Sequence, residues 1–182
     1  MQRIKALGGG IAIQHRMAYQ AEHFIRRYGK LAAANAPPVK RMLELGIPVG
    51  LGTDGTRVAG YNPWIALYWI TTGKTIGGTA AMAQQNVLDR NTALRLMTSG
   101  GYALIRDSLR GKLLKGYTAD LVMLSDDYLN VSDEKIKEIR SRLTVVGGRI
   151  VYAVDDYKIF SPARLEVSPE WSPVRWYGGY QY

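Results

Sequence analysis

One short stretch of this chain ends in a carboxylate that is placed for chemistry. Residues 47–55 read Ile-Pro-Val-Gly-Leu-Gly-Thr-Asp-Gly, which is typical of a buried strand with Asp54 at its C-terminal tip. In α/β proteins, ligands and catalytic groups gather at the C-terminal ends of parallel strands. Asp54 is therefore the first candidate for a catalytic residue. The alternative is a simple tight turn, because Asp and Gly are both common in turns for backbone reasons.

Two more polar side chains are candidates for contact with a substrate. Residues 11–14 form a second short apolar strand, and His15 follows at its tip as Asp54 follows the other strand. We expect His15 to line a pocket as a hydrogen-bond donor. Arg57 could bind an anionic or carbonyl group, although an exposed loop arginine is as often merely solvated. The other histidine, His23, is predicted to lie on the surface of a helix.

The elements around these residues alternate between helix and strand. A helix that ends in Gly8-Gly9-Gly10 precedes the first strand, and helices at about 19–28 and 38–45 separate it from the second. Such alternation is typical of βαβ units in a parallel sheet. Asn62-Pro63 then opens another helix, and a further one begins near Asp89 and continues to about residue 104.

The pattern changes after Gly111. Short strands are predicted at 112–114 and 119–124, followed by a helix with Ser132 as its N-cap. Two strands then flank Gly147-Gly148, which is a strong signal for a two-residue hairpin. Residues 161–182 hold several prolines and aromatic residues, so we expect a tail without regular structure that packs on the surface.

Composition limits the classes of protein that the chain can belong to. Its 182 residues, 47% of them hydrophobic, suit one packed domain, or one domain with an appended piece. No membrane span or signal peptide is visible, and we therefore expect a cytoplasmic protein without membrane association. The sequence has no cysteine, which excludes disulfides and thiolate metal sites and leaves the redox compartment open.

Charge is distributed unevenly along the chain. Residues 1–100 carry twelve Lys and Arg against four Asp and Glu, whereas residues 101–182 carry twelve against eleven. A basic bias can indicate nucleic acid, but no nucleic-acid-binding motif accompanies it. We therefore predict no nucleic-acid partner, and a missing acidic partner surface is an equally good explanation.

Together, these motifs resemble the C-terminal third of a metal-dependent amidohydrolase, closest to the long subgroup that includes N-substituted formamide deformylases. The resemblance covers nearly the whole chain. It rests on an ordered set of motifs: Gly50-Leu51-Gly52-Thr53-Asp54, Asn62-Pro63-Trp64, the helix of residues 89–98, the run from Gly111 to Val122, and residues 143–152.

The resemblance implies a fold and an activity. Residues 1–108 would be the last two βα units of a (β/α)8 TIM-type barrel, and 109–160 the C-terminal strands of a small companion β-sandwich. The activity implied is hydrolysis of a non-peptide C–N bond in a small molecule through a metal-activated water. In such enzymes the aspartate after the eighth strand contacts the metal and takes the proton of that water, and Asp54 matches this position. The cofactor implied is a divalent metal, zinc first.

The remaining metal ligands of the family are missing from this sequence. A His-x-His pair, a mid-barrel carboxylate or modified lysine, and further single histidines would be required, and His15 and His23 cannot replace them. Two strands also cannot close an eight-stranded barrel. The chain is thus interpreted as a truncated or split amidohydrolase, inactive alone, whose partner is the missing N-terminal half of the barrel or another chain.

A second hypothesis belongs to a different class. The chain would be a non-catalytic fragment or an interaction subunit that docks on a partner through its uncovered sheet edge. Both hypotheses are compatible with a homo-oligomer.

Overall fold

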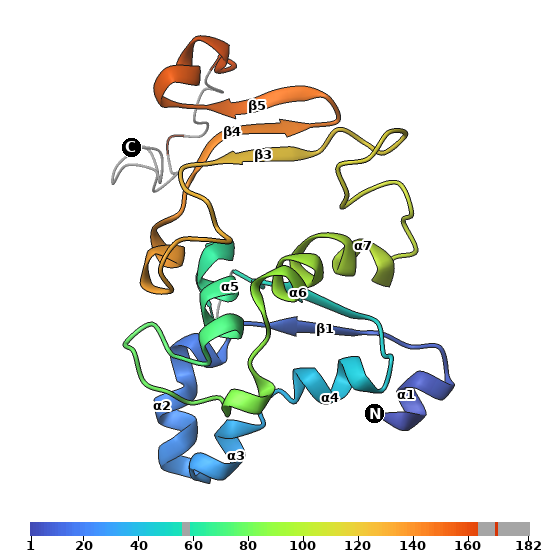
Figure 1. The fold of residues 1–182 in the computed structure, drawn as a ribbon, viewed down its shortest axis with the longest axis vertical. Coiled ribbons are helices and arrows are strands. Elements are labelled where there is room, and N and C mark those ends of the chain that lie inside the picture. The colour runs from blue at the N-terminus through green and yellow to red at the C-terminus, as the bar shows by residue number, and fades with distance from the viewer. Residues whose placement is uncertain (56–58, 164–169, 171–182) are drawn as a thin grey trace.

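The computed structural model describes residues 1–55, 59–163 and 170 (Figure 1). Helices and strands alternate up to residue 104, and short strands dominate afterwards. In chain order the elements are α1 (Gln2–Ala6), β1 (Ile11–Gln14), α2 (Met17–Tyr28), α3 (Lys30–Ala34), α4 (Val39–Glu44), β2 (Val49–Gly52), α5 (Pro63–Thr72), η1 (Gln84–Asn86), α6 (Arg90–Arg95), η2 (Leu96–Gly100), α7 (Gly101–Leu104), β3 (Leu121–Leu124), η3 (Glu134–Glu138), β4 (Ser141–Val146), β5 (Arg149–Ala153) and η4 (Asp155–Phe160).

Strands β1 and β2 form a two-stranded parallel sheet. Their register runs from Ile11 opposite Val49 to Gln14 opposite Gly52. Three helices, α2 to α4, connect the two strands, as a parallel crossover requires. This confirms the predicted βαβ arrangement. Each strand has one edge that pairs with no other strand among the described residues.

The two faces of this sheet differ in chemistry. Ile13, Val49 and Leu51 are buried in the main core, whereas Ala12 and Gln14 are exposed on the other face of β1. The exposed side chains are small or polar because the apolar residues of β1 alternate toward the helices.

The helix predicted from Asp89 to about residue 104 is present but irregular. It begins at Arg90, with the Asp89 carboxylate accepting a hydrogen bond from the Thr92 amide at 2.9 Å, and it ends at Leu104. Residues Leu96–Gly100 in its middle form a π-helical turn. Such turns interrupt α-helices where packing demands an extra residue, and the sequence pattern did not predict this one.

The second part of the chain is a three-stranded antiparallel sheet in the order β3-β4-β5. The hairpin predicted at Gly147-Gly148 joins β4 to β5, and both glycines have positive φ, 57° and 78°. The strand predicted at residues 112–114 is wrong. There the backbone forms turns, with the Tyr117 amide donating to the Leu114 carbonyl oxygen at 3.1 Å. The segment after Ser132 is a short 3₁₀ helix, and no side chain caps it.

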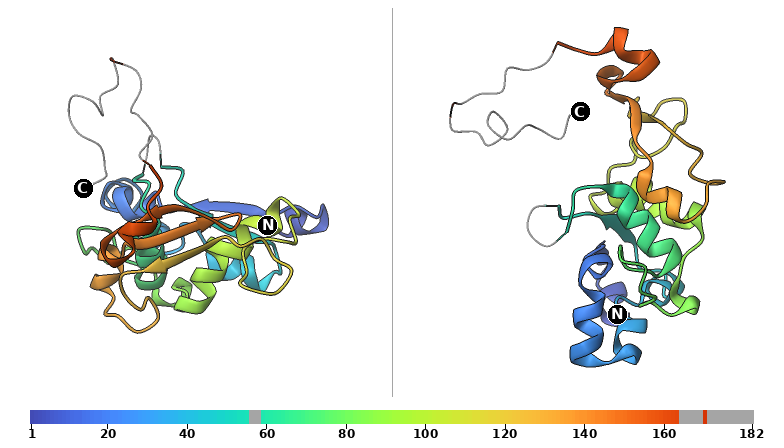
Figure 2. Two further views of the ribbon diagram at one scale, coloured as in Figure 1. Left: turned by 90° about the horizontal axis from the view of Figure 1, so that it is seen from above. Right: turned by 90° about the vertical axis from the view of Figure 1, so that its left-hand side faces the viewer.

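Polar contacts and a shared core join the two parts. The hydroxyl of Tyr68 on α5 donates to Glu134 at 3.0 Å, and Arg90 donates to the Tyr128 carbonyl oxygen at 2.8 Å. Ile136 and Tyr128 belong to the same buried cluster as the α5 side chains. Figures 1 and 2 show the three-stranded sheet at one end of the molecule and the β1–β2 sheet with its helices at the other.

The predicted tail and the predicted absence of a membrane span can be checked only on the described residues. Most of the predicted tail at 161–182 lies outside the described residues, so its packing on the surface stays a prediction. Among the described residues, none of the helices is long and apolar enough to cross a bilayer.

Candidate active site at the C-terminal edge of β1 and β2

The parallel register brings two of the predicted site residues to one edge of the sheet. The last pair of the ladder is Gln14 opposite Gly52. His15 follows this pair by one position on β1, and Asp54 follows it by two positions on β2. Both residues therefore emerge at the C-terminal edge, where α/β proteins place functional groups.

Asp54 is exposed and has an unusual backbone conformation. Its φ of 47° lies in the left-handed region, which aspartate tolerates better than most residues. Gly55 follows, and a Cβ built there would stand 2.5 Å from the Tyr61 Cα atom. Only glycine therefore lets the two ends of the loop approach so closely. The segment is thus a tight turn that also presents a carboxylate to solvent, so the turn interpretation and the catalytic one are compatible.

His15 occupies a very different environment from Asp54. Its side chain is fully buried, and neither ring nitrogen forms a hydrogen bond with a described residue. Burial lowers the pKa of the imidazole below 6.5, and the nearby backbone of Gly52 and Gly60 offsets this effect only in part. The ring is therefore held neutral at pH 7.

Tyr19 encloses the histidine from the first turn of α2. Its ring packs edge-on against the His15 imidazole, with 5.4 Å between the ring centroids. A Cβ at Gly60 would collide with the Tyr19 hydroxyl oxygen. Residues on both flanks of Asp54 thus pack against the pair of His15 and Tyr19. The sequence analysis did not single out Tyr19, because His15 lies before α2 and no helical spacing relates the two residues.

Burial makes direct contact between His15 and a substrate harder than we expected. The imidazole is fully buried, with the backbone of Gly52 and Gly60 close to it, whereas Asp54 is exposed. The role of His15 as a pocket-lining donor stays a prediction. Arg57 falls outside the described residues, so its predicted contact with a substrate stays a prediction as well.

The described residues do not by themselves fit a zinc centre. Such a centre usually takes three protein ligands from histidine, carboxylate or cysteine side chains. Within residues 1–55, 59–163 and 170, no three such side chains are grouped closely enough to hold a metal ion. Asp54 can supply one carboxylate ligand to a metal ion. His15 is buried and packs against Tyr19 of this chain.

Comparison with known proteins decides the family. The family model described as "Amidohydrolase family" matches residues 1–152. This chain belongs to the amidohydrolase family. The resemblance seen in the sequence is thereby confirmed at the level of the family, whereas the narrower formamide-deformylase subgroup stays a prediction.

Two curated relatives of this amidohydrolase chain share a name. A "5-methylthioadenosine/S-adenosylhomocysteine deaminase" of Desulfovibrio desulfuricans is 33% identical over 147 residues, which cover 72% of this chain and 31% of the relative. The protein of the same name from Carboxydothermus hydrogenoformans is 32% identical over 120 residues, covering 66% of this chain and 27% of the relative. The chain thus spans less than a third of the length of each.

Solved structures share the fold. An uncharacterized metal-dependent hydrolase from Pyrococcus horikoshii superposes with a TM-score of 0.60 at 22% identity, over 72% of this chain and 27% of that one. A variant of atrazine chlorohydrolase TrzN from Arthrobacter aurescens, complexed with zinc and atraton, superposes with a TM-score of 0.50 at 24% identity, over 64% and 27%. At such identities the likeness supports an α/β fold of the amidohydrolase type.

Proposed function

We propose that this chain supplies the C-terminal part of the active site of a metal-dependent amidohydrolase. Residues 1–108 would form the last two βα units of a (β/α)8 barrel, and residues 109–160 part of the companion β-sandwich. The reaction would be hydrolysis of an amide- or formamide-like C–N bond, other than a peptide bond, in a small molecule. Family membership supports this proposal, as do two relatives whose names describe deaminases.

The observation that carries the proposal is the parallel register of β1 and β2, which places Asp54 at the C-terminal edge of the sheet. There its carboxylate is exposed and free to accept a proton from a water molecule that attacks the substrate. Since the described residues do not complete a metal site, the cofactor of the whole protein, a divalent metal with zinc first, would need ligands from outside this chain.

The substitution Asp54→Asn tests the role of the carboxylate in the complete protein or in a reconstituted assembly. The amide keeps the size of the side chain but cannot accept the proton. We expect hydrolysis to fall by about 10²- to 10⁴-fold, the usual contribution of general base catalysis. Glu44→Gln is the control, because Glu44 lies on the surface in an ion pair with Arg41. Retained turnover in Asp54→Asn would remove Asp54 from the mechanism.

A second candidate function is that of a non-catalytic interaction subunit. The edges of the β1–β2 sheet that pair with no strand in the described part of the chain favour it, because a free edge is a template for another strand. Metal analysis of the purified chain tests whether this chain holds a metal by itself. Stoichiometric, tightly bound zinc would contradict our conclusion that most metal ligands lie outside this chain. A His-x-His strand encoded upstream would favour the split or truncated enzyme.

A further inference from the structure

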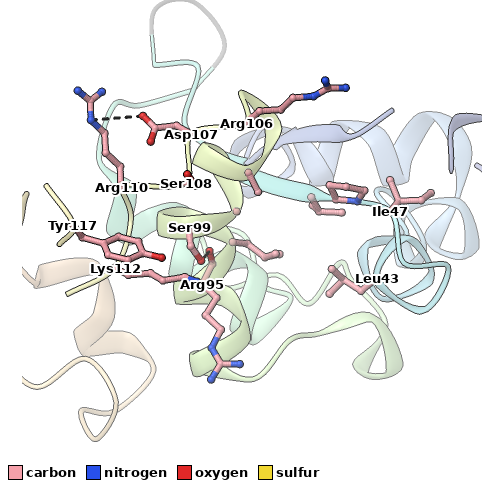
Figure 3. Close-up of a pocket in the computed structure, with 15 residues that line it drawn as sticks. Leu43, Ile47, Arg95, Ser99, Arg106, Asp107, Ser108, Arg110, Lys112 and Tyr117 are labelled. Carbon is pink, nitrogen blue, oxygen red and sulfur yellow. Dashed lines mark hydrogen bonds and ion pairs between the residues drawn. The ribbon is translucent and has the colours of Figure 1, made fainter. Parts of the chain in front are cut away.

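A hollow of about 560 Å³ lies at the opposite end of β2 from Asp54. Its apolar part is formed by residues at the start of β2 and by α4 and η2, among them Leu43, Val49 and Leu96. Figure 3 shows the hollow with its polar residues around it. Because it opens at the N-terminal edge of the sheet, this hollow is separate from the candidate active site.

Positive charge dominates the lining of the hollow. Arg95, Arg106, Arg110 and Lys112 line it, together with one acidic side chain, Asp107. The Arg110 Nε atom lies 3.7 Å from a carboxylate oxygen of Asp107 (Figure 3) and 4.0 Å from one of Asp120, whereas no carboxylate of the described residues forms an ion pair with the other three cations. Lys112 also lies over the Tyr117 ring, with 5.9 Å between its Nζ atom and the ring centroid. A lining with more cations than carboxylates attracts an anionic group.

The backbone at Arg106 supports a role for this side chain. Arg106 follows the end of α7 and has a φ of 58°, a left-handed conformation that glycine usually provides after a helix. For an L residue other than Asn or Asp this conformation costs about 1 kcal/mol or more. A conformation that costs free energy at an arginine suggests that its guanidinium group has a function, such as binding an anionic group.

Exposed apolar side chains continue from the hollow along the segment that joins the two parts of the chain. Ile105, Leu109, Leu113 and Leu114 are exposed by 69%, 58%, 74% and 58%. Together with the hollow they form a surface of mixed apolar and cationic character. An apolar surface of this kind typically marks a protein interface rather than a site for a small ion.

We propose that this surface, the hollow and residues 105–114, is a docking site for an acidic polypeptide segment that carries apolar side chains. The segment would belong to the part of the amidohydrolase that this chain does not span, so the inference rests on the proposed function. Charge complementarity supports it, because four basic side chains and one acidic side chain line the hollow. A small anion fits less well, since ligand pockets bury most of their ligand and the Arg110 side chain here is 49% exposed.

Binding of a synthetic peptide to the full chain tests the proposal. The probe is a fluorescein-labelled peptide with the core sequence Glu-Glu-Leu-Leu-Glu-Glu, followed by fluorescence anisotropy at low and high salt. We expect saturable binding that weakens with salt. The double variant Arg95→Glu/Arg106→Glu should weaken binding about ten-fold or more and should instead bind the peptide with Lys in place of Glu.

Matched controls make each outcome decisive. Arg27→Glu changes an exposed arginine on α2, away from the hollow, and should leave the affinity unchanged. Asp54→Asn should also bind normally, so a failure of the proposed catalytic role would leave this result intact. The proposal is overturned by an absence of binding, by equal binding of a peptide with Gln for Glu, or by inorganic polyphosphate that competes as well as the acidic peptide.

Discussion

Gly100 packs directly against the backbone of Val49. A Cβ atom built at Gly100 would stand 2.5 Å from the Val49 carbonyl oxygen, far inside van der Waals contact. Across the same contact, a Cβ at Gly50 would stand 3.0 Å from the Gly101 Cα atom. The π-helical turn and β2 therefore touch backbone to backbone, with no room for a side chain between them. This contact fixes the strand that delivers Asp54.

The first prediction tests this contact with Gly100→Ala. The added methyl group must push α7 away from β2, and overpacking of this kind costs about 1–3 kcal/mol of the free energy of unfolding. Urea denaturation followed by circular dichroism measures the change. Gly101→Ala is the matched control, because a Cβ there meets no atom within 4 Å and its φ of −62° is helical. Replacing that glycine should stabilise the chain by about 0.4–1 kcal/mol. Equal effects of the two substitutions would refute the close contact.

The second prediction concerns His15 and pH. Because burial lowers the pKa of His15 in the folded chain, the unfolded chain binds the proton more readily. The contribution of His15 to stability is therefore complete above pH 6.5 and is lost as the pH falls from 6.5 through the folded-state pKa. Unfolding free energies measured from pH 8 down to about pH 5 should show this loss, on top of that from the carboxylates.

Variants of the two histidines separate the pH effect of His15 from that of the carboxylates. His15→Gln removes the titrating ring and should flatten the pH dependence below 6.5, although it also lowers stability at every pH. His23→Gln changes the exposed histidine on α2 and should keep the slope of the original chain. If both variants show the same slope as the original, His15 is not buried as a neutral ring.

The third prediction concerns Asn86, a buried amide that joins three segments. Its Nδ2 donates to the Pro37 carbonyl oxygen at 2.7 Å, and its Oδ1 accepts from the Lys40 amide at 3.1 Å. Asn86→Ala leaves both backbone groups without this partner, which should cost about 1–3 kcal/mol for each group that stays buried. Gln85→Ala, at an exposed neighbouring position, should change the unfolding free energy by less than about 0.5 kcal/mol. If Asn86→Ala leaves the unfolding free energy unchanged, water replaces the hydrogen bonds of the amide.

Local patterns in the sequence were sufficient to predict the two strands that carry the candidate site and the hairpin of the second sheet. Apolar runs bounded by glycine predicted β1 and β2, and Gly147-Gly148 predicted the hairpin, because each of these signals lies within a few neighbouring residues. The same kind of signal failed at residues 112–114. A short apolar run there is also compatible with an exposed turn, and no strand is available to pair with it among the described residues.

The sequence by itself determined the family, the order of helix and strand, and the position of Asp54 after its strand. Only the tertiary structure decided that His15 is buried against Tyr19, and that Arg95, Arg106 and Lys112 surround one hollow. The physical reason is range. Periodicity and turn chemistry act between neighbours in the chain, whereas burial and the gathering of charges depend on how distant segments pack, for which no single stretch of sequence is sufficient.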